Sequence, residues 1–317
     1  MKEMIVTENL TKNFNDFVAV DGVNLRVQAG EVLALLGPNG AGKTTTVRML
    51  TSILRPTKGR AWVAGYDVAS ESPQVRKAVG ILTEHHGLYK RMFMEEYLDF
   101  FGQLYEMDAQ QRKVRIRDLL QEFGLDQVTG RRIGEFSKGM RQKLSLAQAL
   151  LHSPPVLLLD EPTSAMDPES AHLVRDAIES LRSAERAIII CTHNLVEAEE
   201  LADKIAIIRR GKIIASGSPQ SLKKQLLGLG EYQVTFREPL DGRKLPLPSD
   251  VNMTSTGVNW FRYQAAYPEI ANPNLLQHLL GAGFSVIGLQ EVPRSLEQVY
   301  LQAVNAPSEK EEVENVE

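Results

Sequence analysis

The segment GPNGAGKT, residues 37–44, constrains the fold more than any other part of the sequence. It matches the phosphate-loop pattern G-x-x-x-x-G-K-[ST], with the apolar run EVLALLG before it and the helix-forming run TTVRML after it. A strand, a tight glycine loop and a helix in this order predict an α/β fold whose loop amides face a phosphate. The plain alternative is a glycine-rich turn with an incidental lysine, and the flanking strand and helix make it the poorer interpretation.

The residue types of this loop suit a bound triphosphate. Glycines allow backbone turns that side chains would block, so that successive N–H groups can point at the phosphates. Lys43 would reach the β- and γ-phosphates, and the Thr44 hydroxyl would be a ligand of Mg²⁺. The predicted nucleotide-binding residues are Gly37, Pro38, Asn39, Gly40, Ala41, Gly42, Lys43, Thr44 and Thr45.

A second acidic motif, LLLDE, ends in Asp160 and Glu161. A carboxylate at the end of a buried apolar strand is costly unless a cation meets it, so Asp160 is predicted to be another Mg²⁺ ligand. Glu161 is placed to accept a proton from the water that attacks the γ-phosphate, and we expect it to be the general base. The two motifs together predict a chain that binds and hydrolyses a nucleoside triphosphate.

Composition limits the class of protein. The chain has 317 residues, 43% of them hydrophobic, which is enough for a sizeable core and typical of a soluble protein. Its net charge of −4 gives no reason to expect a nucleic-acid partner. No apolar run approaches the roughly 18 residues of a spanning helix, and the first residues lack the core of a secretion signal. The single cysteine, Cys191, lies in the apolar run AIIIC and is expected in the core.

Hydrophobic periodicity predicts three parts. Residues 1–229 form an α/β nucleotide-binding domain, into which a helical subdomain of about residues 92–152 is inserted. Residues 230–304 are predicted to form a small appended α+β domain in which no catalytic constellation can be recognised, and the acidic tail 305–317 is expected to be disordered.

Three local predictions are specific enough to test. The segment RAWVAGYDV is expected to be one strand, and the Asn272-Pro273 pair is expected to open a helix that stops near Gly281. The aromatic residues Trp260, Phe261 and Tyr263 are expected in a strand core.

The order of the motifs resembles the nucleotide-binding subunit of an ABC transporter. FSKGMRQK precedes the LLLDE strand, PTSAMD follows that strand, and ICTHN comes after both. The family's signature is usually written LSGGQ and here reads FSKGM, which keeps Ser137 and Gly139. Lys138 and Met140 in the other slots resemble the branch that powers drug, sodium and polymer exporters.

The resemblance implies roles for individual residues. Ser137, Lys138, Gly139 and Met140 would contact ATP held by a second copy, Ser164 and Asp167 would belong to the D-loop, His193 would contact the γ-phosphate, and Phe14 would stack on adenine. Each role has a structural alternative. Phe14 suits a core position at a strand end, Asp167 suits a helix cap, and His193 suits an ordinary loop.

The chain departs from the family pattern at Thr83-Glu84, where the family usually has proline and glutamine. That glutamine contacts Mg²⁺ in the family, and glutamate is also an oxygen ligand, so Glu84 is predicted to be a metal ligand. His85 and His86 have no third ligand of suitable spacing, so no separate metal site is predicted there.

The function that the resemblance implies is an ATPase that forms a homodimer around two ATP and drives export through a separate membrane permease. Such a subunit is cytoplasmic and peripheral at the inner face of the membrane, and the segment GLYKRMFMEEYL would form the groove for a permease helix. One rival is a soluble ABC protein that acts on ribosomes or nucleic acid. The other is a phosphate-loop kinase, which would not need FSKGM ahead of the acidic strand.

Overall fold

The computed structural model describes residues 2–83 and 87–305 and divides into two compact units, residues 1–219 and 220–317, which we describe separately. This division lies earlier in the chain than the boundary predicted at residue 229. The predicted metal ligand Glu84, the pair His85 and His86, and all but the first residue of the predicted disordered tail lie outside the described residues.

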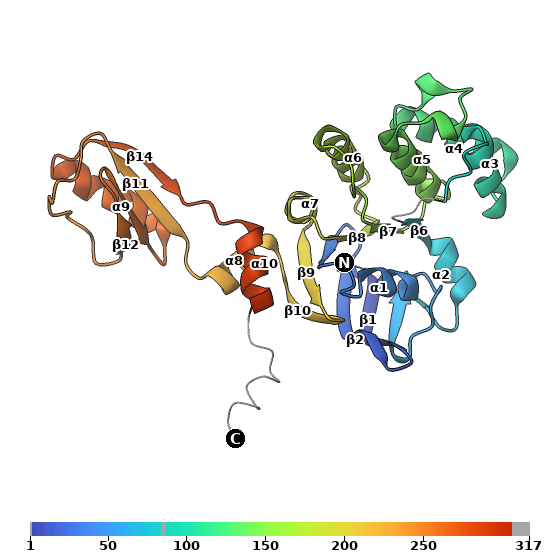
Figure 1. The fold of residues 1–317 in the computed structure, drawn as a ribbon, viewed down its shortest axis with the longest axis horizontal. Coiled ribbons are helices and arrows are strands. Elements are labelled where there is room, and N and C mark those ends of the chain that lie inside the picture. The colour runs from blue at the N-terminus through green and yellow to red at the C-terminus, as the bar shows by residue number, and fades with distance from the viewer. Residues whose placement is uncertain (1, 84–86, 306–317) are drawn as a thin grey trace. The chain divides into compact units, whose positions relative to one another are not determined.

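A six-stranded sheet forms the centre of the first unit (Figure 1). Its order is β10 (Lys212–Gly217), β9 (Lys204–Arg209), β3 (Val32–Leu36), β8 (Ala187–Thr192), β7 (Val156–Asp160) and β6 (Val79–Leu82). Every neighbouring pair is parallel except β10 with β9. The carboxyl ends of β3, β8 and β7 therefore meet at one edge, where an open α/β sheet binds its ligand.

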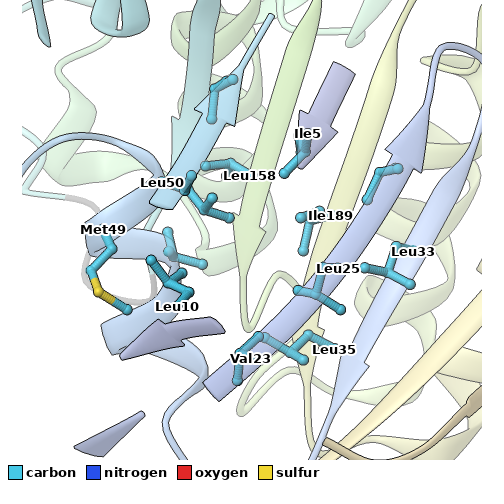
Figure 2. Close-up of a cluster of buried hydrophobic side chains, with 14 of the residues drawn as sticks. Ile5, Leu10, Val23, Leu25, Leu33, Leu35, Met49, Leu50, Leu158 and Ile189 are labelled. Atoms are coloured by element: carbon cyan, nitrogen blue, oxygen red, sulfur yellow. The ribbon is translucent and has the colours of Figure 1, made fainter. Parts of the chain in front are cut away.

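Side chains of the central strands alternate between two cores. Val156 and Leu158 of β7 pack into one hydrophobic cluster, and Leu157 and Leu159 pack into the other. The first cluster, shown in Figure 2, joins this sheet to α1 (Lys43–Leu50) and to a second sheet. Burial on both faces explains why these strands read as continuous apolar runs. Cys191 lies in the first cluster, as predicted, and burial raises the pKa of its thiol.

The second sheet is antiparallel and has the order β2 (Phe17–Gln28), β1 (Glu3–Phe14), β4 (Lys58–Val63) and β5 (Tyr66–Asp67). The prediction of one strand over RAWVAGYDV was wrong, because the chain reverses between β4 and β5. Ala64 and Gly65 both have positive φ at this turn, with values of 53° and 90°. Two left-handed residues in succession are typical of a tight hairpin turn, and the dipeptide Ala-Gly gives only a weak signal for it.

The remaining helices of the first unit include a helical group next to the sheet (Figure 1). This group contains α3 (Met94–Leu104), α4 (Ala109–Glu122), α5 (Lys138–Leu150) and the short 3₁₀ helices η1 (Asp126–Val128) and η2 (Ile133–Glu135); the other helices are α2 (Ser72–Ala78), α6 (Pro168–Ser180) and α7 (Leu195–Leu201). A contact between two aromatic rings joins the end of α3 to the end of α5. His152, just after α5, stacks on Tyr105 at the end of α3, with ring centroids 3.8 Å apart and planes 13° from parallel.

The second unit is a four-stranded antiparallel sheet with α9 packed against it (Figure 1). Its elements are α8 (Pro219–Leu227), which begins at the boundary, β11 (Glu231–Phe236), β12 (Asn252–Thr256), β13 (Trp260–Gln264), α9 (Pro268–Gly281), β14 (Val286–Glu291) and α10 (Leu296–Asn305), and the sheet order is β12, β13, β11, β14. Its core is built around Phe236, Phe261 and Leu275.

Two expectations for this unit need correction. Phe261 and Tyr263 are buried as predicted, but Trp260 is only half-buried. Successive residues of a strand face opposite sides, so Trp260 lies on the side away from Phe261 and Tyr263. There the guanidinium of Arg262 lies over its ring, 5.1 Å from the centroid. The helix α9 begins at Pro268 and not at Asn272, because a proline suits the first turn and the buried stripe already starts at Ala271.

Among the described residues, no helix combines the length and the apolar character that crossing a membrane requires.

Candidate active site

The three strand ends that meet at one edge of the six-stranded sheet carry the predicted chemistry. The phosphate loop follows β3, Asp160 ends β7 and is followed by Glu161, and His193 follows β8. Two backbone bonds join the three ends, since Gly37 N donates to Thr192 O at 3.2 Å and Glu161 N donates to Cys191 O at 2.8 Å. Residues that are more than 150 positions apart in the sequence thus form one site.

Glycine is required at two points of the phosphate loop. A Cβ on Gly37 would collide with the carbonyl oxygen of Ile208 on β9. Gly42, which precedes α1, has φ +111°, and its Cβ would lie 2.6 Å from Ala19 O on β2. The loop therefore lies tightly between two strands, and α1 starts with backbone N–H groups that have no intrahelical partner and can bind phosphate.

Lys43 is held at the centre of this loop with only 5% of its surface exposed. Its Nζ donates to Gly37 O at 2.6 Å and to Pro38 O at 3.2 Å, and it forms an ion pair with Glu161 Oε1 at 3.2 Å. The ammonium thus has partners in its own loop and in the predicted general base. A γ-phosphate is an anion like the glutamate carboxylate, so Lys43 could move from Glu161 to the phosphate, and His193 would remain beside the buried carboxylate.

Glu161 connects the lysine to the histidine. The carboxyl group is 8% exposed, and its Oε2 lies 2.8 Å from His193 Nδ1. Its backbone has φ +52°, which is uncommon for a residue with a side chain and is often found at functional sites. This left-handed turn directs the carboxylate to the loop side of the sheet edge, where a base for hydrolysis would lie.

The donors for magnesium are chemically suitable. Thr44 follows Lys43 on α1, helix α1 contacts β7, and Asp160 ends β7 with 4% of its surface exposed. A hydroxyl and a carboxylate are the hard oxygen ligands that Mg²⁺ prefers. These residues therefore fit the ion that the sequence predicts.

The nucleotide cavity also contains a residue that the sequence analysis missed. A cavity of about 320 Å³ is lined by the phosphate loop, Glu161, and two β2 residues, Phe17 and Ala19. Phe17 is 63% exposed and pairs directly with Phe14 across the β1–β2 hairpin. Phe14 is 43% exposed and lies under Lys12, whose Nζ is 5.2 Å from the ring centroid. Stacking of Phe14 on adenine stays a prediction. Phe17 is a second candidate for this contact, and its pairing with Phe14 across the hairpin is the feature that could have indicated it.

The signature segment starts a helix, as predicted. Ser137 caps α5, its Oγ accepting a hydrogen bond from Met140 N at 3.2 Å, and it is exposed. Gly139 lies close to α6, where an added Cβ would be 3.7 Å from Ser170 Oγ. Lys138 points to the segment after Glu161 and donates to the carbonyl oxygens of Ser164 and Ala165.

Asp167 caps α6, which was one of its two predicted roles. Its Oδ1 accepts from Ser170 N at 2.9 Å, and this bond is the main cause of a lowered pKa of the Asp167 carboxyl. The family role of Asp167 in the D-loop stays a prediction, and the cap does not compete with it.

A second buried acid next to the site was also missed. Glu197, in the first turn of α7, is fully buried. Burial, and to a smaller extent the charge of Glu161, raises the pKa of Glu197, while the hydroxyls of Thr192 and Thr163 lower it. The sequence offers only its position four residues after His193 as a signal.

Comparisons with known proteins agree with this geometry. Residues 20–164 match the ABC transporter family. The chain is 39% identical to the ABC transporter ATP-binding protein NatA of Bacillus subtilis over 224 residues, 69% of this chain and 91% of NatA. It is 33% identical to the Nod factor export ATP-binding protein I of Rhizobium sp. (strain N33) over 309 residues, 98% of this chain and 99% of that protein. A solved structure of the ATP binding subunit of an ABC transporter superposes with a TM-score of 0.65 at 28% identity, covering 71% of this chain and 94% of that one.

The similarities confirm the predicted fold class, an α/β phosphate-loop cassette with a helical insertion. They also exclude the kinase alternative, since the residues that match the ABC transporter family, 20–164, contain both the phosphate loop and the signature segment. The chain belongs to the ATP-binding subunits of ABC transporters, and it is an ATPase.

Proposed function

We propose that this chain pairs with a second copy around two ATP molecules and drives export through a separate integral membrane permease. The observation that carries the proposal is the network of Lys43, Glu161 and His193 at the phosphate loop, together with an exposed signature cap at Ser137. The first can hydrolyse ATP, and the second offers a helix start to a ligand held elsewhere.

Each hydrolytic residue has one task. Lys43 exchanges the Gly37 and Pro38 carbonyls for phosphate oxygens. Glu161, released from the lysine, accepts a proton from the attacking water, and His193 orients this carboxylate. Thr44 and Asp160 would hold Mg²⁺, with Glu84 as a further proposed ligand. The ion would supply charge neutralisation between the phosphates.

Pairing follows from the signature helix. The amides at the start of α5 favour an anion, and Ser137, Gly139 and Met140 lie at this start. A γ-phosphate bound by the phosphate loop of a second copy would meet them. Ser164 and Asp167, between Glu161 and α6, would lie along the same contact. ATP then joins two copies, and hydrolysis separates them.

The permease would contact an exposed apolar patch of Tyr89, Phe100 and Leu104, whose side chains are 52%, 42% and 62% exposed. The rings of Tyr89 and Phe100 meet edge to face with centroids 6.3 Å apart, so the patch is ordered. Tyr89 lies in the segment that the sequence analysis assigned to a permease helix, and the patch extends that segment along α3.

Export, with the chain at the inner face of the cell membrane, is supported by the Nod factor export relative, whose match extends over both units. The alternative is an ABC ATPase that acts on ribosomes or nucleic acid. The chain's net charge of −4 argues against it.

The experiment uses tagged Glu161→Gln, which should bind ATP but hydrolyse it slowly. The purified variant, of 35.3 kDa per chain, should double its mass by light scattering with ATP and Mg²⁺ but not with ADP. The same variant should retain a polytopic membrane protein when it is captured with ATP from detergent-solubilised host membranes. The double variant Lys43→Ala, Glu161→Gln is the matched control, which should do neither. Retention of ribosomal or nucleic-acid partners alone would reject the transporter role.

A further inference from the structure

The segment that joins the general base to α6 has an unusual backbone. From Glu161 to Met166 it makes two tight turns, in which Ser164 N donates to Glu161 O at 3.2 Å and Met166 N donates to Thr163 O at 3.3 Å. Both Glu161 and Ala165 have φ +52°. Left-handed residues with a side chain are unfavourable, so this conformation has to be stabilised by contacts from outside the segment.

Helix α5 provides these contacts from one face. Gln142, which is buried, donates from Nε2 to Pro162 O at 2.5 Å. Lys138 donates from Nζ to Ser164 O at 2.7 Å and to Ala165 O at 2.6 Å. The two residues are four positions apart, so they lie on the same face of the helix. Three of the four carbonyls from residue 162 to residue 165 therefore accept a hydrogen bond from α5.

We propose that Lys138 is a positioning residue for hydrolysis, which fixes the segment after Glu161 by its bonds to the Ser164 and Ala165 carbonyls. Lys138 is the first residue of α5, directly after the Ser137 cap. Its side chain thus joins the start of the signature helix to the residues that follow the general base. The usual signature has glycine in this slot and cannot make these bonds.

The hydrogen bonds of the Lys138 ammonium favour a positioning role over the role of a phosphate ligand. An ammonium has three donors, and two of them are used on carbonyl oxygens. Hydrogen bonds from a charged donor are stronger than neutral ones, so releasing both to reach a phosphate would leave the left-handed segment without its support. The sequence analysis placed Lys138 on the partner's ATP, and the two roles predict different kinetics.

The test compares Lys138→Met, which keeps the aliphatic stem, with Lys138→Arg, which keeps the charge and the donors. The control is Lys143→Met, the same change on the same helix. For Lys138→Met we expect kcat for ATP to fall about tenfold with KM within about twofold, which is the signature of a group that acts after binding. Lys138→Arg should restore most of kcat, and Lys143→Met should change neither constant.

Binding is measured separately in the Glu161→Gln background. Lys138→Met should leave the ATP-induced doubling of mass intact. An unchanged kcat would overturn the proposal. So would a raised KM at normal kcat, or loss of the ATP-induced dimer, since both identify a phosphate ligand. One part of this inference rests on the proposed function: the connection from Lys138 to ATP held by a second copy requires that two copies pair. If Glu161→Gln itself never doubles in mass, the proposed function fails, and the kcat comparison still decides the role of Lys138.

Discussion

At the scale of single residues, the site is a row of three side chains, Lys43, Glu161 and His193, that pair with one another. Lys43 and Glu161 neutralise each other at 3.2 Å with little solvent around them, and His193 holds the other carboxylate oxygen at 2.8 Å. This pairing offsets part of the free-energy cost of burying the two charges. In the proposed mechanism, a bound triphosphate takes the place of Glu161 beside Lys43, and this exchange releases the carboxylate to act as the base.

Removing the His193 side chain should show whether it orients the Glu161 carboxylate or contributes to ATP binding. We expect His193→Ala to lower kcat by about 100-fold, because a misdirected general base loses most of its catalytic effect. KM should change little, since Lys43 and the loop amides remain. Steady-state phosphate release measures both constants. If KM rises as steeply as kcat falls, His193 contributes mainly to ATP binding and not to the orientation of Glu161.

Phe17 should contribute to nucleotide affinity. It lines the nucleotide cavity and is 63% exposed, so stacking on adenine would bury much of its ring. We expect Phe17→Ala to weaken ATP binding by about 1 kcal/mol, roughly fivefold, the usual worth of an aromatic contact. Calorimetric titration of the Glu161→Gln variant with ATP gives the dissociation constant. Phe14→Ala is the matched comparison, and a loss seen only there would assign the adenine contact to Phe14 alone.

At the scale of elements, the packing of α3 against the end of α5 contains a pH-sensitive contact. His152 stacks on Tyr105, and its Nε2 lies 3.2 Å from Val79 O. Burial lowers the pKa of His152 to about 4 from an ordinary 6.5. Between these two values the unfolded chain binds a proton that the folded chain does not bind, so the free energy of unfolding falls as the pH falls through this window.

His152→Phe should remove this dependence, because phenylalanine can keep the stack without titrating. Between pH 7 and pH 4.5 the parent should lose about 2 kcal/mol more stability than the variant, less than the full shift implies because the half-buried ring is partly screened by water. Urea unfolding at several pH values measures the difference. Parallel losses in both proteins would mean that His152 titrates normally, since the carboxylates are common to both.

The elements also show how far sequence reasoning reaches. Strands buried on both faces, such as β3, β7 and β8, were predictable because an apolar run ending in a functional residue leaves few alternatives. The phosphate loop and the acids after β7 were predictable for the same reason. The break at Ala64-Gly65, the start of α9 and the outward side of Trp260 were not, because they depend on cross-strand register and on a core that forms only in three dimensions. The bonds of Lys138 were also hidden, since they link its side chain to carbonyls 26 and 27 residues away.

At the scale of the whole molecule, the two units have separate hydrophobic cores. Phe261 is fully buried in the core of the second unit, whereas the first unit holds the other two clusters and the nucleotide site. A ligand that binds only the folded form of one unit stabilises that unit, and the stabilisation grows with the logarithm of the ligand concentration above the dissociation constant.

Differential scanning calorimetry can test whether the two units unfold independently. We expect Phe261→Ala to destabilise the second unit by about 3–5 kcal/mol, the usual cost of a large core cavity. The ATP effect is measured in the Glu161→Gln background. ATP with Mg²⁺ should raise the unfolding temperature of the first unit by the same amount whether or not Phe261→Ala is also present. Ile287→Ala, at a 65% exposed position of β14, is the surface control. A smaller ATP effect in Phe261→Ala alone would show that the second unit takes part in nucleotide binding.

Side chains of β7 alternate between the two hydrophobic clusters, and this alternation constrains the number of residues in the strand as well as their apolar character. Deleting one residue before Asp160 would send every later side chain of the strand to the opposite face, exchanging the contents of the two clusters. It would also move the acidic pair by one step, so that Glu161 would occupy the place of Asp160, the predicted metal ligand. Substitutions can therefore accumulate in this strand as long as they remain apolar, while insertions and deletions cannot. Among functional variants of the chain, we expect changes in length to be confined to the connections between elements.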